Sequence, residues 1–127
     1  MTDTTKQDDL EAGIEVRTRL LGSDNVSRPR TSDAVAPDLG RLSDEVLWGR
    51  IWARPGLDLK LRSLTVVAAL VALERYDYAE AHIRGARGVG FTRDEMVEVM
   101  MQLTFYVGLP VAHEGIKLVT KVYGEGD

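Results

Sequence analysis

Residues 64–73 are LTVVAALVAL, the longest apolar run in the chain. Ten residues are about half of what a helix needs to cross a bilayer, so we interpret this run as part of a buried helix. Asp58 is a candidate cap for a helix over residues 59–75, because aspartate accepts hydrogen bonds from the free N–H groups of a first turn. Its second half is apolar nearly all round, which predicts a central position in the fold.

Helical periodicity continues on both sides of this segment, and no segment alternates with period two between hairpin turns. Thr92 and Glu95 form a candidate capping box, and Pro110 suits the first turn of a helix. The expected helices, besides 59–75, cover residues 10–21, 38–53, 77–87, 92–107 and 110–123. We therefore predict an all-α, single-domain bundle of about five or six helices over residues 10–127, preceded by a flexible N-terminus at 1–9.

The composition of the 127 residues excludes several kinds of chemistry. The chain has no cysteine, so disulfides, thiolate metal sites and thiol nucleophiles are absent, and its two histidines offer little for a metal site. The net charge of −4 disfavours nucleic acid, because phosphate binding needs a basic surface. The first ten residues are polar and acidic, unlike a signal peptide, so we expect no membrane partner and a cytoplasmic location.

His82 is the first candidate for chemistry. It shares the expected inward stripe of its helix with Ala79, Ile83 and Ala86. Such a histidine is either a core side chain satisfied by one hydrogen bond, or a pocket residue that transfers a proton near neutral pH, with an ordinary pKa of about 6.5.

Arginines supply the second candidate set, because a guanidinium binds carboxylates in a planar, bidentate way. Arg84 and Arg87 are three residues apart, so they form either a carboxylate clamp or a solvated face with Glu80 as partner. Arg62 stands just before the apolar run, where partial burial would require an anion. Arg54 follows Trp52, and Trp52 forms either a packing ridge with Trp48 or a pocket wall.

Polar residues of the last two expected helices form a third set. Gln102 and Tyr106 are four residues apart, and they line either a polar cavity or an ordinary solvated face. His113 and Glu114 follow Pro110 in the final helix. None of these patterns is specific by itself.

Taken together, the order and spacing of several stretches resemble the carboxymuconolactone decarboxylase family, within the alkylhydroperoxidase-like superfamily. The resemblance spans about residues 10–123, nearly the whole chain. The matching stretches are VRTRLLG at 16–22, WGRIWARPGLD at 48–58, RSL at 62–64, HIRGA at 82–86 and GFTRDE at 90–95, followed by Gln102, Tyr106, Gly108 and Pro110.

The resemblance implies an all-α fold that assembles into trimers or hexamers, with active sites near the subunit contacts. The founding activity of the family removes carbon dioxide from 4-carboxymuconolactone without a metal or an organic cofactor. For this chain it implies a cofactor-free carbon–carbon lyase acting on a small carboxylic acid or lactone. His82 would transfer the proton, and Arg54, Arg62 and Arg84 would bind carboxylate or enolate oxygen. Of these arginines, Arg84 is the nearest to His82 in sequence.

The peroxidase branch of the superfamily carries Cys-x-x-Cys seven and four residues before this histidine. Arg75 and Tyr78 occupy those positions here, and Ser63 replaces the glutamate of the preceding helix. The resemblance therefore implies that this chain is not a thiol peroxidase.

The segment after Pro110 departs from the family pattern, which commonly runs through small residues to an asparagine and a histidine. His113 and Glu114 change the polarity of whatever this segment lines. Two alternatives to a decarboxylase follow. One is an isomerase or cyclase of specialised metabolism that uses His82 and His113 as a proton-shuttle pair, and the other is a non-catalytic, oligomeric ligand-binding protein.

Overall fold

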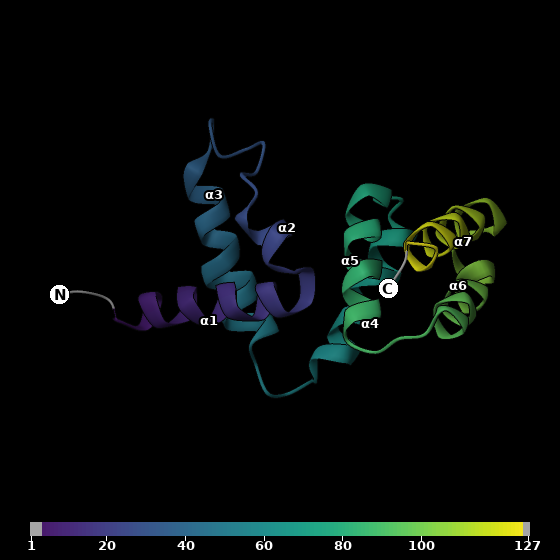
Figure 1. The fold of residues 1–127 in the computed structure, drawn as a ribbon, viewed down its shortest axis with the longest axis horizontal. Coiled ribbons are helices and arrows are strands. Elements are labelled where there is room, and N and C mark those ends of the chain that lie inside the picture. The colour runs from purple at the N-terminus through teal and green to yellow at the C-terminus, as the bar shows by residue number, and fades with distance from the viewer. Residues whose placement is uncertain (1–3, 126–127) are drawn as a thin grey trace. The chain divides into compact units, whose positions relative to one another are not determined.

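The computed structural model describes residues 4–125 (Figure 1). Within these residues the chain forms seven α-helices and one π-helix, with no strand, which confirms the all-α prediction. The chain divides into two compact units, Met1–Asp58 and Leu59–Asp127, here called unit 1 and unit 2. Each unit is described by itself.

Unit 1 contains α1 (Thr4–Leu21), α2 (Ser23–Ser27), α3 (Pro37–Leu42) and the π-helix η1 (Ser43–Trp52). The helix α1 begins at Thr4, whereas we expected it from residue 10, so residues 4–9 of the expected N-terminal segment are helical and residues 1–3 lie outside the described part. The helix predicted over 38–53 is divided into α3 and η1. Ala53 N donates to Trp48 O at 3.0 Å, the wider spacing of a π turn.

Two glycines allow α1 and η1 to cross at very short range (Figure 1). A Cβ atom on Gly13 would lie 1.8 Å from the carbonyl oxygen of Asp44, and one on Gly49 would lie 2.1 Å from that of Asp9. Any side chain at these positions would force the two helices apart.

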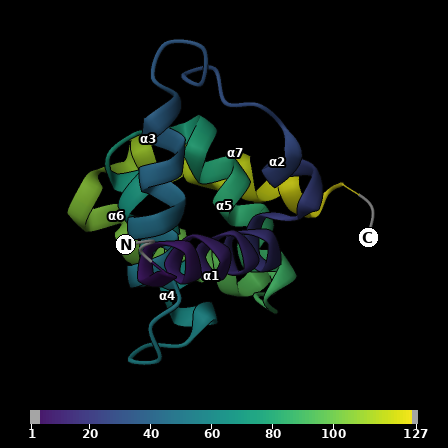
Figure 2. The same ribbon diagram turned by 90° about the vertical axis from the view of Figure 1, so that its left-hand side faces the viewer.

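An ion-pair cluster fixes the rest of unit 1 to this crossing. The Asp44 carboxylate accepts hydrogen bonds from Arg17 at 2.5 Å and from Arg30 at 2.9 Å, and Arg17 also donates to the carbonyl oxygen of Val26. Arg30 belongs to the connection between α2 and α3, which is visible in the turned view (Figure 2). The cluster therefore joins α1, the connection and η1.

Unit 2 contains α4 (Leu59–Ala72), α5 (Tyr76–Gly88), α6 (Arg93–Val107) and α7 (Leu109–Tyr123). The capping box predicted for α6 is present, since Glu95 N donates to Thr92 Oγ1 at 3.1 Å and Thr92 N donates to Glu95 Oε1 at 2.9 Å. Gly108, with φ of 96°, turns the chain into α7, and Pro110 lies in the first turn of α7 as predicted.

The core of unit 2 lies among all four helices, with α5 packed on both α4 and α7. Its buried members are Val67, Val71, Ala79, Ile83, Ala86, Phe91, Met96, Met100, Val119 and Val122. Within unit 2, α4 contributes one buried stripe of Ser63, Val67 and Val71, while Leu73 is exposed. The prediction was a central position, and within unit 2 the helix α4 contacts all three of the other helices, α5, α6 and α7.

The segment between α4 and α5 is a turn, although a continuous helix was predicted through residue 75. Glu74 adopts the left-handed conformation with φ of 58°, which is uncommon for any residue other than glycine, asparagine or aspartate. No helix in the part of the chain that the structure describes is long and apolar enough to cross a membrane.

Candidate active site

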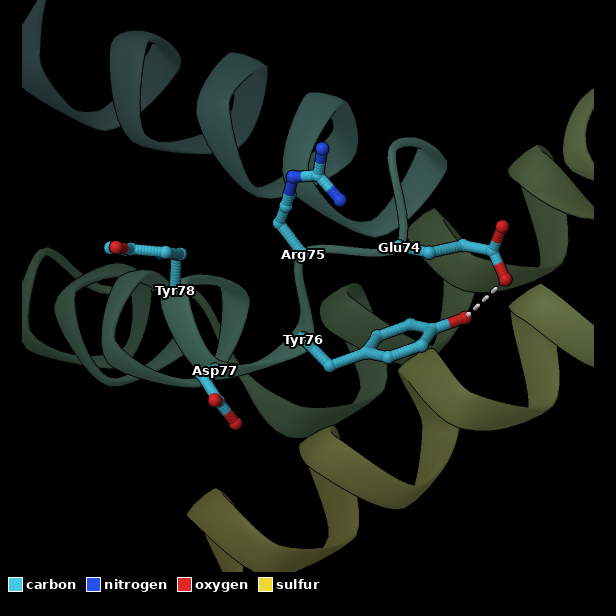
Figure 3. A pocket seen from close by; sticks show the side chains of 5 residues that line it. All are labelled: Glu74, Arg75, Tyr76, Asp77 and Tyr78. Atoms are coloured by element: carbon cyan, nitrogen blue, oxygen red, sulfur yellow. Dashed lines mark hydrogen bonds between the residues drawn. The ribbon is translucent and has the colours of Figure 1, made fainter.

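A pocket of about 260 Å³ opens where α4 turns into α5 (Figure 3). Five consecutive residues line it: Glu74, Arg75, Tyr76, Asp77 and Tyr78. The left-handed Glu74 reverses the chain direction, and the Arg75 N–H closes the turn by donating to the carbonyl oxygen of Leu70 at 2.9 Å. The pocket is therefore built by one local turn and the first residues of α5.

The side chains that line this pocket point in different directions. In Figure 3, Arg75 extends toward α4, Tyr78 extends sideways away from Arg75, and Asp77 points away from α4. The Tyr76 hydroxyl donates to the Glu74 carboxylate at 3.5 Å. Burial, and then the charges of Glu74 and Glu114, raise the pKa of Tyr76. The effect of Glu114 means that the first part of α7 lies near this end of α5.

His82 lies one helical turn beyond Tyr78 on α5 and is largely buried. Its neighbours on the predicted inward stripe, Ala79, Ile83 and Ala86, are fully buried, which confirms the orientation of this face of the helix. Burial lowers the pKa of His82 from 6.5 to about 4, so the imidazole is neutral at pH 7 in the ligand-free protein. This differs from the prediction of an ordinary histidine that titrates near neutral pH.

Ser63 brings a second polar group into the interior of unit 2. Its side chain is fully buried on α4, and its hydroxyl makes no hydrogen bond to the residues that the structure describes. A hydroxyl buried in this way has lost its hydration without compensation, which is unusual in the interior of a protein.

Arg84 is held by two protein carboxylates. It donates to Glu125 from Nε at 2.9 Å and from Nη2 at 2.5 Å, and Nη1 lies 2.8 Å from Glu80 Oε2. Two positions along a helix correspond to a rotation of about 200°, so Arg84 and His82 leave α5 in nearly opposite directions. The structure thus does not bring together the two residues that we predicted to be catalytic, and it shows the pairing with Glu80 that the alternative interpretation required.

The other predicted site residues of unit 2 lie on helices other than α5, and most of them are more exposed than His82. Arg62 is half-buried next to Ser63 on α4. Gln102 and Tyr106 are exposed on α6, and Tyr106 keeps 82% of its surface in solvent. On α7, His113 is exposed and Glu114 forms an ion pair with Lys117 at 3.0 Å.

Two predicted site residues belong to unit 1. Trp52 is buried and stacks on Trp48 with the ring centroids 4.5 Å apart, so the packing-ridge interpretation describes its position in this unit. Arg54 is exposed just beyond η1.

Arg75 and Tyr78 were not among the predicted site residues, although they line the pocket. A signal was present in the sequence. Residues 75, 78 and 82 are spaced as i, i+3 and i+7, which places them on one face of a helix.

Comparison with known proteins gives a consistent result. The profile of the carboxymuconolactone decarboxylase family matches residues 37–121. A 4-carboxymuconolactone decarboxylase of Acinetobacter baylyi is 34% identical over 112 residues, which cover 87% of this chain and 84% of the relative. A nitrosuccinic acid decarboxylase of Metarhizium robertsii is 31% identical over 117 residues, which cover 91% of this chain and 82% of the relative.

Proposed function

The chain belongs to the carboxymuconolactone decarboxylase family, and from this premise we propose that it is a cofactor-independent decarboxylase of small, activated carboxylic acids. The acids named for its two relatives support this class. In 4-carboxymuconolactone an unsaturated lactone, and in nitrosuccinic acid a nitro group, accepts the electron pair that the departing carboxylate leaves behind. An acid with such a built-in acceptor needs no electron sink from the protein.

The proposed reaction breaks one carbon–carbon bond. The bond to the carboxylate breaks, its electron pair moves into the acceptor to form a dienolate or a nitronate, and carbon dioxide leaves. A proton then adds to a carbon atom of this anion, which restores a neutral acceptor group. The protein has to hold the acid, stabilise the anion and deliver the proton.

His82 is the proton-transfer residue in this proposal, and its burial is the observation that carries it. With a pKa of about 4, the His82 imidazole is almost entirely unprotonated at pH 7 and has no added proton to donate. An anionic substrate placed beside it would raise the pKa, because an opposite charge stabilises the imidazolium form. His82 would then take up a proton when the substrate binds and give that proton to the substrate carbon.

The remaining predicted residues keep their proposed roles in binding. Arg54 and Arg62 are proposed to bind carboxylate or enolate oxygen, and Arg84 would join them only by exchanging Glu125 for a ligand. Further contacts with the acid are proposed for a polar and aromatic set: Trp52, Gln102, Tyr106, His113 and Glu114.

The direct test supplies purified protein with 4-carboxymuconolactone, and separately with nitrosuccinate, and measures carbon dioxide release. We expect turnover of at least one acid, and a decrease of roughly 10²-fold or more in His82→Asn, the usual contribution of a general acid or base. The matched control is Arg93→Gln, because Arg93 is exposed and its partner among the described residues is its neighbour Asp94. Unchanged turnover in His82→Asn, with folding intact, would overturn the assignment.

A non-catalytic ligand-binding protein is the second candidate, and the ion pairs of Arg84 favour it. An arginine already neutralised by Glu80 and Glu125 has less charge to offer a reacting anion. Binding of either acid without release of carbon dioxide or solvent-proton exchange would support this candidate. Exchange or rearrangement without carbon dioxide would instead support an isomerase or cyclase.

We further propose that the protein is a homo-oligomer, a trimer or a hexamer. Large apolar side chains are exposed near the junction of α6 and α7: Met101, Phe105, Tyr106 and Leu109. Phe105 keeps 98% of its surface in solvent. Exposed apolar surface of this kind is typical of a face that another protein covers.

A further inference from the structure

Arg75 differs from the neighbouring arginines of unit 2. Arg84, Arg87 and Arg93 each donate to a protein oxygen. The Arg75 guanidinium makes no hydrogen bond or ion pair with any residue in the described part of the chain, and it lines the pocket between α4 and α5. An arginine that is not engaged by the protein, at the wall of a small pocket, is available to an anionic ligand.

The turn keeps the nearby carboxylates away from this guanidinium. Asp77 points to the opposite side of α5, and the Glu74 carboxylate accepts the hydrogen bond of Tyr76 (Figure 3). Glu74, with φ of 58°, occupies the left-handed position of a helix C-terminal cap, in which Glu74 N donates to Val71 O and Arg75 N donates to Leu70 O, both at 2.9 Å.

The pocket also lies in line with His82. Tyr78 and His82 share one face of α5, with a rise of about 6 Å along the helix between them, and Arg75 is the N-cap residue that precedes this helix. A ligand held at Arg75 would therefore extend along this face toward the imidazole. The volume of about 260 Å³ suits a small acid better than a larger ligand.

We propose that this pocket is a carboxylate subsite, in which Arg75 binds a carboxylate that the substrate keeps and Tyr78 contacts the unsaturated body of the substrate. The inference rests on the proposed decarboxylation. A cation that bound the departing carboxylate would stabilise the ground state and slow its loss, so strong binding is useful only at a carboxylate that remains in the product. The substrate class is then a small dicarboxylic acid.

Tyr78 provides an aromatic side chain in the same pocket as Arg75. It keeps 68% of its surface in solvent, and its hydroxyl makes no hydrogen bond to described residues. A phenol placed in this way can stack on a planar, unsaturated ring or group.

The test separates binding from turnover. Binding of succinate, a dicarboxylate that does not react, is measured by calorimetry for the wild type and for Arg75→Gln, with Arg93→Gln as the matched control. We expect Arg75→Gln to weaken binding roughly 10- to 100-fold, the usual contribution of a hydrogen-bonded charge pair. Arg75→Lys should recover part of this loss, and the control should bind as the wild type does. Equal binding by wild type and Arg75→Gln, or no binding by the wild type, would overturn the subsite.

A kinetic test uses the reactive acid and its monoester, in which the carboxylate that is kept is masked. We expect Arg75→Gln to raise KM for the free acid roughly tenfold or more with little change in kcat, and to leave KM for the monoester unchanged. An equal effect on both substrates would contradict the proposed role. Succinate binding that depends on Arg75 without any release of carbon dioxide would leave the subsite standing and reject the decarboxylase.

Discussion

Glu125 binds Arg84 through two parallel hydrogen bonds, from Nε to Oε1 at 2.9 Å and from Nη2 to Oε2 at 2.5 Å. The pair joins the residues that follow α7 to the middle of α5. Glu80 contributes a second carboxylate to Arg84 and also accepts from Lys121 at 2.8 Å, so α5 and α7 are linked by a network of charges on the surface of unit 2.

We expect Glu125→Gln to have a small effect. The two side chains are each 37% exposed, and ion pairs with that much solvent contribute about 1 kcal/mol or less. Urea unfolding should therefore show a loss of no more than about 1 kcal/mol in the free energy of unfolding. KM for the acid should not change, because Arg84 keeps Glu80. A lower KM in this variant would mean that Glu125 competes with the substrate for Arg84.

The crossing of α1 and η1 should be sensitive to a single methyl group. Gly49→Ala would place its Cβ 2.1 Å from a backbone carbonyl oxygen that cannot move aside as a flexible side chain can. We expect a loss of about 1–3 kcal/mol or more in the free energy of unfolding of unit 1, the usual cost of overpacking. Gly56→Ala is the matched control, because no atom lies within 4 Å of the Cβ it would add. Equal stability of the two variants would show that the crossing is looser than described.

The burial of His82 predicts how stability depends on pH. The folded-state pKa of about 4 lies below the ordinary value of 6.5, so the unfolded chain binds a proton in this interval that the folded protein does not. The contribution of neutral, buried His82 to the free energy of unfolding is fully present above pH 6.5 and is lost as the pH falls toward 4. The expected loss between pH 7.5 and pH 5 is about 2 kcal/mol. Urea unfolding of the wild type and of His82→Gln at the two pH values measures it, and a similar loss in both proteins would contradict this role.

The predictable parts of the fold are those that depend on neighbours in sequence. The Thr92–Glu95 capping box, Pro110 and the buried face of α5 follow from spacings of three and four residues. The turn at Glu74 did not follow, because the sequence there contains none of the glycines or prolines that usually mark a helix end, although the hydrogen bonds that close it, to Val71 O and Leu70 O, are local. The π-helix η1 was missed because apolar spacing alone does not separate a π turn from an α turn.

In the candidate site, too, the features that depend on neighbours in sequence were predictable and those that depend on distant residues were not. The partner of Arg84 at position i−4, Glu80, was recognised from spacing, whereas Glu125 is 41 residues away and nothing local connects the two. The burial of His82 follows from the inward face of α5 that it shares with Ala79 and Ile83, but its lowered pKa depends on the helices packed around α5. Arg75 and Tyr78 share the His82 face by spacing, yet only the turn at Glu74 creates the pocket that they line.

The exposed aromatic side chains of α6 predict how assembly responds to substitution. Phe105→Asp replaces an apolar side chain that is 98% exposed with a charge, so the fold of unit 2 should not change. If this side chain is covered by a second copy of the chain, the buried charge is costly and the assembly dissociates. We expect light scattering to show a trimer or hexamer for the wild type and a smaller species for Phe105→Asp, with unchanged helix content by circular dichroism. An equal mass for both proteins would place the subunit contact elsewhere.

Substrate binding should be coupled to proton uptake by His82. In the protein without ligand the imidazole is neutral at pH 7 because its pKa is about 4, and a carboxylate bound beside it favours the imidazolium form. Calorimetric titration with succinate at pH 7, in buffers with different ionisation enthalpies, should therefore reveal a fraction of a proton taken up per ligand. His82→Asn should still bind the ligand but take up no proton, and Arg93→Gln should behave as the wild type does. Equal proton uptake by the wild type and His82→Asn would assign the proton to another group and remove His82 from the proposed transfer step.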